Sequence, residues 1–402
     1  MKTFRLLIIV LFAAILSSVY AQEEEERKIF EIYGFVMMDA GYNANQIHPD
    51  WFDVVRPSKL PSYAGEYGTN GNFFFSVRQT RFGTKAWIPT RLGDIKTIFE
   101  FELFGTGVDA GQTTLRLRHA YAELGHFGVG QYWSPFMDID VFPNTVEYWG
   151  PNGMVFFRNI QVRWMPIMGD TRLTFALERP GASADQGVYS NRIELEGVSS
   201  HFPVPDFSAE YRYGGKFGYV ELAGILRYMA WKDMNDDKLD LTGHAIGWGL
   251  NLSSNIKFNK SLVGRFQAVY GEGIENYMND APADVGIKNN FDDEEQPILG
   301  IPLPVLGVVA FLDQQWNDKF SSSLGYSMVD INNTDGQNDS EYHRGHYALA
   351  NLLYYPVQNA MMGVEAQYGT RENKDGWQTN IFKVQFSFKY NFGHAWYKKQ
   401  KI

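Results

Sequence analysis

The stretch FKVQFSFKYNF, residues 382–392, alternates without interruption between large apolar and polar side chains. Successive side chains of a β-strand point to opposite faces, so this pattern predicts a strand with one apolar and one polar face. Such a strand is typical of a wall between lipid and water. The apolar residues of the stretch share one parity and are Phe382, Val384, Phe386, Phe388, Tyr390 and Phe392.

The first 21 residues have the features of a secretory signal peptide. A basic start precedes an apolar run over 6–16, and small residues lead to a V-x-A motif that ends at Ala21. The run is short for a membrane span, so we expect cleavage after Ala21 and export of a single domain over 22–402. An uncleaved anchor is the alternative.

The composition of the 402-residue chain narrows its class further. It has no cysteine, a formal net charge of −10 and 16% aromatic residues. The absence of cysteine excludes disulfides, and the acidic balance argues against nucleic acid as a partner. The most apolar later run, 298–312, contains two prolines and two glycines, which disfavour a helix. The aromatic content favours an all-β protein with a surface in contact with lipid.

About sixteen alternating segments follow one another along the chain, and the connections between them alternate in length. Tight turns are predicted at 89–93, 125, 166–169, 214–216, 256–260, 316–319 and 356–359. The other connections are mostly longer: 43–72, 106–112, 134–155, 180–205, 232–241, 274–304, 331–341 and 372–377.

This alternation predicts an all-β fold, a transmembrane antiparallel up-and-down β-barrel of about 16 strands. Outer-membrane barrels direct tight turns to the periplasm and longer loops outward. We therefore expect the outer membrane of a Gram-negative bacterium, with its lipids around the barrel. The alternative is a secreted β-sandwich that acts in carbohydrate binding or surface adhesion.

Charged residues on two neighbouring segments share the predicted lumen face. A hairpin centred on Asp109 places Glu102 opposite Arg116 and Glu100 opposite Arg118. The two arginines would lie about 7 Å apart and repel by roughly 2 kcal/mol, which the glutamates offset. These charges either set the field of a narrow section or form a solvated ladder on a wet wall.

Further basic residues continue the expected lining. Arg81 and Lys85 lie on the polar face of their segment, and Arg163 lies on the polar face of another one. Arg78 has the parity of the outward Phe82, but a bulge near 79–80 or a position near the rim would bring it inside, so its face stays open. The same parity rule places Tyr121 on the outer face, with Leu115 and Leu117.

The connection 134–155 is unusually apolar and aromatic for a loop in water. We expect it to fold into the barrel as a constriction loop, with Asp138, Asp140 and Glu147 across the lumen from the arginines. Burial at a subunit interface is the alternative.

No pattern indicates catalysis or a resident ion. The eight histidines form neither an H-E-x-x-H pair nor a recognisable nucleophile arrangement. The segment 233–240 resembles a calcium loop only by its acidity. We therefore expect a passive channel without enzymatic activity, cofactor or metal.

Several stretches together resemble the DcaP-like porin family: GFVMMDAGY (34–42), RQTRFG (78–83), GDIKTIFEFELFG (93–105), LRLRHAYAELG (115–125) and GQYWSPFMDIDVFPNTVEYWGPNGMVFFRNIQVRW (130–164). The resemblance implies a sixteen-stranded outer-membrane barrel that is usually trimeric and passes small anionic solutes such as dicarboxylates. On that basis Arg81, Arg116, Arg118 and Arg163 become anion contacts, and 134–155 becomes the constriction loop.

Two consequences of the resemblance concern the ends of the barrel. A homotrimer needs a contact surface on the outer wall, for which Phe30, Ile32, Phe386 and Phe388 are candidates. Many such barrels end on an aromatic residue, whereas Phe392 is followed here by a further ten residues.

Overall fold

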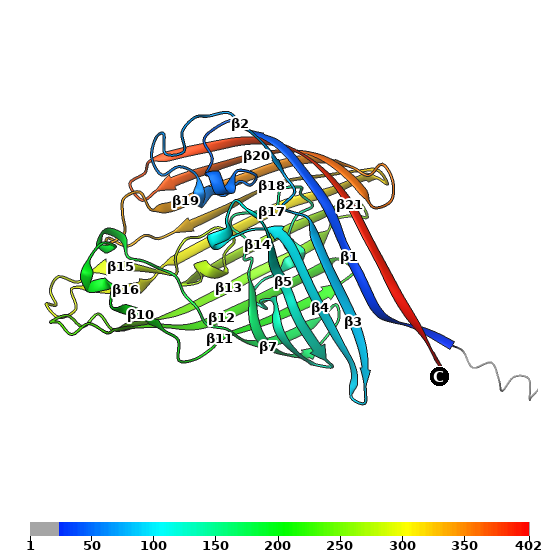
Figure 1. Ribbon diagram of the computed structural model, residues 1–402, viewed down its shortest axis with the longest axis horizontal. Coiled ribbons are helices and arrows are strands. Elements are labelled where there is room, and N and C mark those ends of the chain that lie inside the picture. The colour runs from blue at the N-terminus through cyan, green and yellow to red at the C-terminus, as the bar shows by residue number, and fades with distance from the viewer. Residues whose placement is uncertain (1–23, 402) are drawn as a thin grey trace, which may run out of the picture.

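The structure, a computed structural model, describes residues 24–401, so the expected signal peptide lies outside the described residues. Sixteen antiparallel strands close into a barrel (Figure 1). The barrel strands are β1 (Glu24–Asn43), β3 (Arg81–Thr90), β4 (Gly93–Phe104), β5 (Thr113–Leu124), β6 (Phe127–Trp133), β7 (Arg158–Ile167), β8 (Arg172–Glu178), β11 (Asp206–Gly215), β12 (Gly218–Asp233), β13 (Gly243–Lys257), β14 (Leu262–Glu272), β17 (Pro304–Asn317), β18 (Phe320–Ile331), β19 (Tyr342–Tyr354), β20 (Ala360–Asn373) and β21 (Gln378–Lys401).

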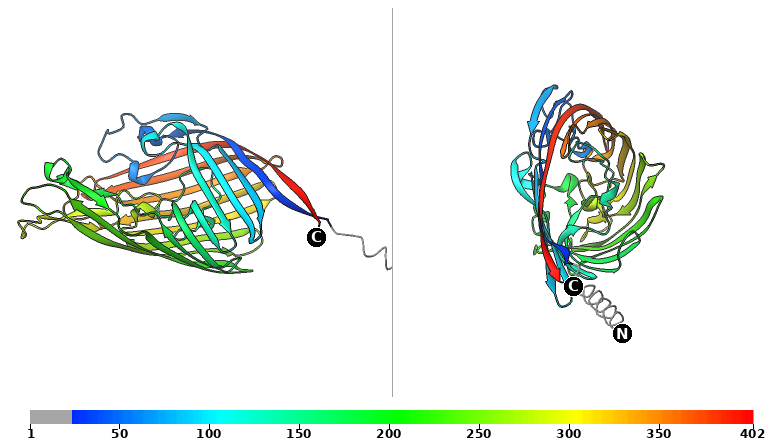
Figure 2. Two further views of the ribbon diagram at one scale, coloured as in Figure 1. Left: turned by 60° about the horizontal axis from the view of Figure 1, so that its bottom comes forward. Right: turned by 90° about the vertical axis from the view of Figure 1, so that its right-hand side faces the viewer.

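The first and last strands close the barrel. β1 pairs with β21 from Glu24 opposite Lys401 to Asn43 opposite Lys383, and its other edge pairs with β3. Closure leaves no unpaired sheet edge in the hydrocarbon, where unmet backbone groups would be costly. Figure 2 shows that β1 and β21 run on together past the barrel wall, so β21 continues beyond Phe392.

The alternating faces of β21 confirm the reading of 382–392. Its apolar side chains are 36–49% exposed on the outer wall, whereas Lys383, Gln385 and Ser387 are fully buried on the inner one. In a membrane the outer face meets lipid, and the polar face is covered by segments that fold into the lumen.

Smaller elements lie at the ends of the barrel strands. β2 (Asn72–Ser76) extends the wall beside β1, and β10 (Val198–His201) does so beside β12. β9 (Ala184–Asp185), β15 (Val285–Asn289) and β16 (Ile298–Pro302) form a separate three-stranded sheet. Among the described residues, no helix is both long and apolar enough to cross a membrane. The 3-10 turns are η1 (Pro49–Trp51), η2 (Pro57–Lys59), η3 (Gly107–Asp109), η4 (Ile139–Val141), η5 (Gly187–Tyr189), η6 (Ile193–Leu195) and η7 (Glu275–Tyr277).

The connections alternate in length, as the sequence predicts. One end of the barrel carries tight turns such as 91–92 and 125–126, and we call it the turn rim. The other end carries long connections, including 44–71, 134–157 and 273–303, and we call it the loop rim. By the rule for outer-membrane barrels, the turn rim faces the periplasm.

A turn over 77–80 interrupts the chain between β2 and β3 and decides the face of Arg78. The Thr80 N–H donates to the carbonyl of Val77 at 3.0 Å, which separates β2 from β3. The turn reverses the phase and brings Arg78 inside, where it is 1% exposed and binds Asp53 through two nitrogens. The face of Arg78, which alternation alone left open, is therefore the inner one.

A β-bulge in β5 corrects two predictions. Glu102 lies opposite Arg116, as the register predicts, but Glu100 lies opposite His119 instead of Arg118. The extra residue reverses the side-chain phase beyond the bulge. Tyr121 is consequently only 7% exposed and lies on the inner wall.

The hydrophobic core lies within the lumen, where loop-rim segments pack. Val55 and Leu60 of connection 44–71 join Phe136 and Val141 of connection 134–157 in one buried cluster with wall residues such as Val329. The end-on view in Figure 2 shows these segments inside the ring of strands. Packed loop-rim segments therefore fill part of the barrel interior and position the functional residues.

Candidate functional site

The connection 134–157, here called the inner loop, runs along the inside of the wall. Near its start, the carbonyl of Phe136 accepts a hydrogen bond from Asn251 of β13 at 2.9 Å. Its middle and end are held by β20 and β18, because the Val146 N–H donates to Glu365 and the Gly153 N–H donates to Ser327 Oγ, each at 2.9 Å. These partners are inward-facing side chains, so the loop lies in the lumen.

The three acidic residues of the inner loop do not face the predicted arginines. Asp138 is fully buried and binds Arg212 of β11 at 2.6 Å, and Asp140 binds the same guanidinium at 2.6 Å. Glu147 is 2% exposed and accepts hydrogen bonds from the backbone N–H groups of Val55, at 2.9 Å, and Gly150. Buried carboxylates need such partners, which explains why the expected position across the lumen is not observed.

Two glutamates of β4 hold a group of arginines, here called the arginine cluster. Arg118 donates to Glu100 at 2.6 Å and to Glu102 at 2.7 Å. Arg81 lies 3.3 Å from Glu102 and 3.8 Å from Glu100. Two more guanidinium groups approach Glu102 less closely, those of Arg116 at 3.7 Å and Arg158 at 3.8 Å.

The arginine cluster carries more positive than negative charge. Four guanidinium groups share two carboxylates, and Glu102 has no exposed side-chain surface. Arg158 has a buried Nη1 atom without a hydrogen-bond partner among the described residues, and its guanidinium lies 5.1 Å from the ring centre of Trp133. Such a group has donor capacity left for an anion.

The inner loop closes over this cluster through Tyr148. The tyrosine ring stacks on Phe104 of β4 with ring centres 3.9 Å apart and 10° between the planes. Its hydroxyl donates to Glu102. Burial and the neighbouring Glu102 raise the pKa of Tyr148, so the hydroxyl keeps its proton and remains a donor.

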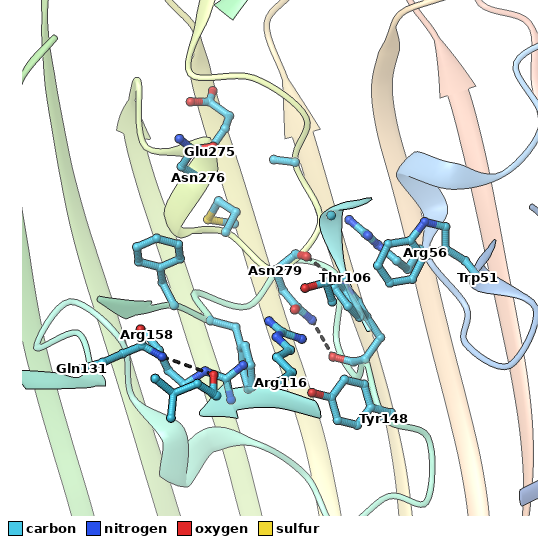
Figure 3. A pocket seen from close by; sticks show the side chains of 17 residues that line it. Trp51, Arg56, Thr106, Arg116, Gln131, Tyr148, Arg158, Glu275, Asn276 and Asn279 are labelled. Carbon is cyan, nitrogen blue, oxygen red and sulfur yellow. Dashed lines mark hydrogen bonds between the residues drawn. The ribbon is translucent and has the colours of Figure 1, made fainter. Parts of the chain in front are cut away.

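A cavity of about 350 Å³ lies on the loop-rim side of the arginine cluster. Arg116 and Arg158 line one side, and Arg56 of connection 44–71 lies on the other, beside Trp51 (Figure 3). The Arg56 guanidinium sits 4.2 Å from the ring centre of Trp51 and 4.0 Å from that of Trp149. Three arginines from distant parts of the chain therefore meet at one cavity.

The sequence reasoning missed Arg56 and Arg158. Arg56 belongs to a loop whose inward fold has no local signal. Arg158 is the first residue of β7 and has the parity of the outward Ile160, so alternation would place it in lipid. A loop-to-strand junction is where the period-2 rule does not hold, and an arginine in a lipid-facing position is itself a signal that it turns inward.

The remaining predicted residues lie on the inner wall with other partners. Arg163 is 9% exposed and donates to Gln161 at 2.7 Å and 3.0 Å. The Lys85 ammonium lies 4.7 Å from the ring centre of Tyr33, whose hydroxyl donates to Glu100 at 2.7 Å. These residues continue the basic inner wall beside the arginine cluster, without lining the 350 Å³ cavity.

A larger hollow of about 730 Å³ lies toward the turn rim. Arg172 and Arg212 contribute to its lining, and they share the carboxylates of Asp138, Asp140, Glu210 and Glu221. Two guanidinium groups thus meet four carboxylates. Lys257 and Arg265 also line this hollow, so basic side chains are present in both regions of the lumen, and carboxylates outnumber arginines only in the group around Arg172 and Arg212.

The family described as DcaP outer membrane protein matches residues 24–392. The chain belongs to this family. Its place in the outer membrane and its nature as a porin-type channel accord with the closed barrel and the inward loop. No curated protein matches the chain.

Solved structures share the fold at low sequence identity. The outer membrane channel DcaP of Acinetobacter baumannii is 21% identical, with a TM-score of 0.75 over 90% of this chain and 97% of that one. An anion-selective porin from Comamonas acidovorans is 9% identical, with a TM-score of 0.57 over 92% and 100%. The trimer form of OmpT from Vibrio cholerae is 11% identical, with a TM-score of 0.54 over 90% and 99%.

Proposed function

We propose that this outer-membrane channel passes small hydrophilic anions by passive diffusion, with carboxylates and dicarboxylates as the solute class. The observation that carries the proposal is the arginine-lined cavity, where Arg56, Arg116 and Arg158 meet and Arg158 has an unused donor. In a narrow section with low-dielectric walls, such fixed charges act strongly on an entering ion.

The arrangement favours transient binding. Arg116 and Arg158 lie 3.7 Å and 3.8 Å from Glu102, outside hydrogen-bonding distance, so either can turn toward a solute without breaking a short contact. A carboxylate fits the planar donor fork of a guanidinium. A solute with two carboxylates can contact two arginines at once, and Glu102 keeps the binding weak enough for release.

The anion preference is expected to be weak. Asp138, Asp140, Glu210 and Glu221 lie further along the lumen and oppose the field of the arginine cluster. An anion that leaves the cavity toward the periplasm approaches these carboxylates, which Arg172 and Arg212 partly neutralise, and it also passes Lys257 and Arg265 in the lining of the same hollow. We therefore expect the channel to favour anions without excluding cations.

The test is conductance through the purified protein in planar bilayers. We expect water-filled pores with a reversal potential of the sign for anions, and a small dicarboxylate should reduce the chloride current more than acetate does. Equal effects of the two carboxylates would contradict the dicarboxylate class. A reversal potential of the sign for cations would contradict the anionic solute class as a whole.

We also propose a homotrimer with the membrane lipids around it. Support comes from the outer face of the closing strands, where Phe386 and Phe388 are 41% and 39% exposed, and from the trimer form of OmpT, which has the same fold. Native mass spectrometry in mild detergent should give the mass of three chains. A monomer in several detergents would contradict this assembly.

A further inference from the structure

The loop rim carries a second candidate site that shares no lining residue with the arginine-lined cavity. It is built by the connections 179–205, 234–242 and 273–303, together with β10 and the small sheet of β9, β15 and β16. In Figure 1 this group forms the end of the molecule around the labels β10, β15 and β16. We call it the loop cluster.

An apolar hollow of about 160 Å³ lies within the loop cluster. Met229 and Trp231 of β12 form part of its lining, with Leu195, Leu241 and Ile298 from the three connections. The Trp231 indole N–H is satisfied by the carbonyl of Leu241 at 2.8 Å, so the ring presents an apolar surface. A cavity of about 150 Å³ with such a lining accepts a benzene-sized group.

A second hollow of about 240 Å³ continues the first one. Leu195, Leu241 and Ile298 line both, so the two hollows share one wall. Phe291 contributes to the second hollow and is 70% exposed. By the rule for outer-membrane barrels these residues lie in water, where an apolar surface of this kind marks an interaction site.

Two acidic segments, one of which also contains Lys238, run beside the same hollows, and the charged lining residues of the second hollow are Arg192 and its ion-pair partner Glu194. The segments 234–242 and 290–296 lie side by side, since the Asp240 N–H donates to the carbonyl of Glu295 at 2.8 Å and Gln296 donates to the carbonyl of Thr242 at 2.9 Å. None of their exposed carboxylates forms an ion pair within residues 24–401 as described. The seven carboxylates belong to Asp236, Asp237, Asp240, Asp292, Asp293, Glu294 and Glu295.

We propose that the loop cluster docks a cationic peptide segment that carries an aromatic side chain, presented from outside the cell. The unpaired carboxylates attract lysine or arginine groups, and the 160 Å³ hollow takes the aromatic side chain. Neither feature alone selects this partner. Leu241 connects the two features, because it follows Asp240 in the chain and lines both hollows.

The test uses the full chain in nanodiscs and a labelled peptide, Lys-Lys-Trp-Lys-Lys, with binding followed by fluorescence anisotropy. One variant combines Asp292→Asn, Asp293→Asn, Glu294→Gln and Glu295→Gln to remove the charge of one segment. A second variant, Ser200→Trp, should fill the 160 Å³ hollow. Ser200 lines this hollow from the exposed strand β10 and lies on the same face of the strand as Val198. The single-channel conductance of both variants should equal that of the parent, which shows that the barrel is folded.

We expect the charge variant to bind the peptide about tenfold more weakly at low salt and Ser200→Trp to bind it several-fold more weakly. Pentalysine and the peptide Ser-Ser-Trp-Ser-Ser should each bind more weakly than the parent peptide. Equal binding by parent and variants would mean that the peptide binds lipid and would overturn the proposal. The proposal would also be contradicted if the protein did not bind the peptide and instead retained lipopolysaccharide through Ca²⁺ bound at the acidic segments.

Discussion

Arg158, the first residue of β7, brings its guanidinium within 3.8 Å of Glu102 on β4 and leaves its buried Nη1 atom without a partner among the described residues. The contact links β4 to the start of β7, the strand that follows the inner loop. The arginine cluster therefore has an incompletely used donor on a side chain that also lines the cavity. The proposed selectivity depends on it.

Replacement of Glu102 by glutamine should lower the stability of the barrel and increase its preference for anions. Glu102 is fully buried and lies near four guanidinium groups, so loss of its charge leaves those groups underpaired. We expect a loss of about 3 kcal/mol in unfolding free energy, and a stronger anion preference in the variants that fold.

Glu123→Gln is the matched control for this variant. Glu123 pairs with Lys96 at 3.1 Å, where the lysine side chain is 52% exposed. Loss of such a surface pair should cost less than about 1 kcal/mol. Urea unfolding of the two variants in detergent makes the comparison, and equal losses would show that Glu102 does not anchor the cluster.

Asp280→Asn should loosen connection 44–71 and widen the cavity. Asp280 is fully buried, binds Arg56 at 3.0 Å and accepts the Ser58 N–H at 2.8 Å. Without its charge Arg56 loses its ion pair beside the cavity, and we expect a larger and noisier single-channel conductance. The exposed Asp236→Asn serves as the control. A conductance equal to that of the parent would mean that connection 44–71 does not narrow the path.

The hold of the inner loop should weaken at alkaline pH. Burial raises the pKa of Glu147 from 4.5 to about 8, although the Lys383 ammonium and two backbone N–H donors oppose the shift. The folded state therefore favours the protonated form. This contribution to stability is complete below pH 4.5 and is lost as the pH rises through 8.

Glu147→Gln provides the comparison for this pH dependence. The amide does not titrate, so the difference in thermal midpoint between parent and variant isolates the carboxyl group. We expect the parent midpoint to fall relative to the variant by a few degrees between pH 5 and pH 9, on the order set by a buried ionisation. A difference that stays constant with pH would show that Glu147 does not titrate in this range.

The sequence was sufficient for the wall of the barrel because the wall obeys a local rule. Lipid on one side and a polar interior on the other impose a period of two, which residues such as Phe386 and Lys383 display directly. Alternation in connection length then orders the strands. The register between Glu102 and Arg116 also followed, since the two strands are consecutive and a single hairpin relates them.

The interior was less accessible to sequence reasoning because its contacts are not local. Neither the bulge beside His119 nor the turn before β3 has a clear signal in composition, yet each reverses a face and moves Tyr121 or Arg78 inward. The partners of Asp138 and Glu147 lie on distant strands and on another loop. Arg56 reaches the cavity only through the fold of connection 44–71.

The most direct measurement of the central claim is the reversal potential of Arg116→Gln/Arg158→Gln in a KCl gradient at low ionic strength. Both arginines line the cavity, and glutamine removes their charge with a side chain that remains polar. Arg192→Gln is the control, because Arg192 lies in the loop cluster with its side chain 63% exposed. We expect the parent and the control to prefer chloride, and the double variant to lose this preference by about threefold in permeability ratio. A reversal potential of the double variant equal to that of the parent would contradict the assignment of selectivity to this cavity.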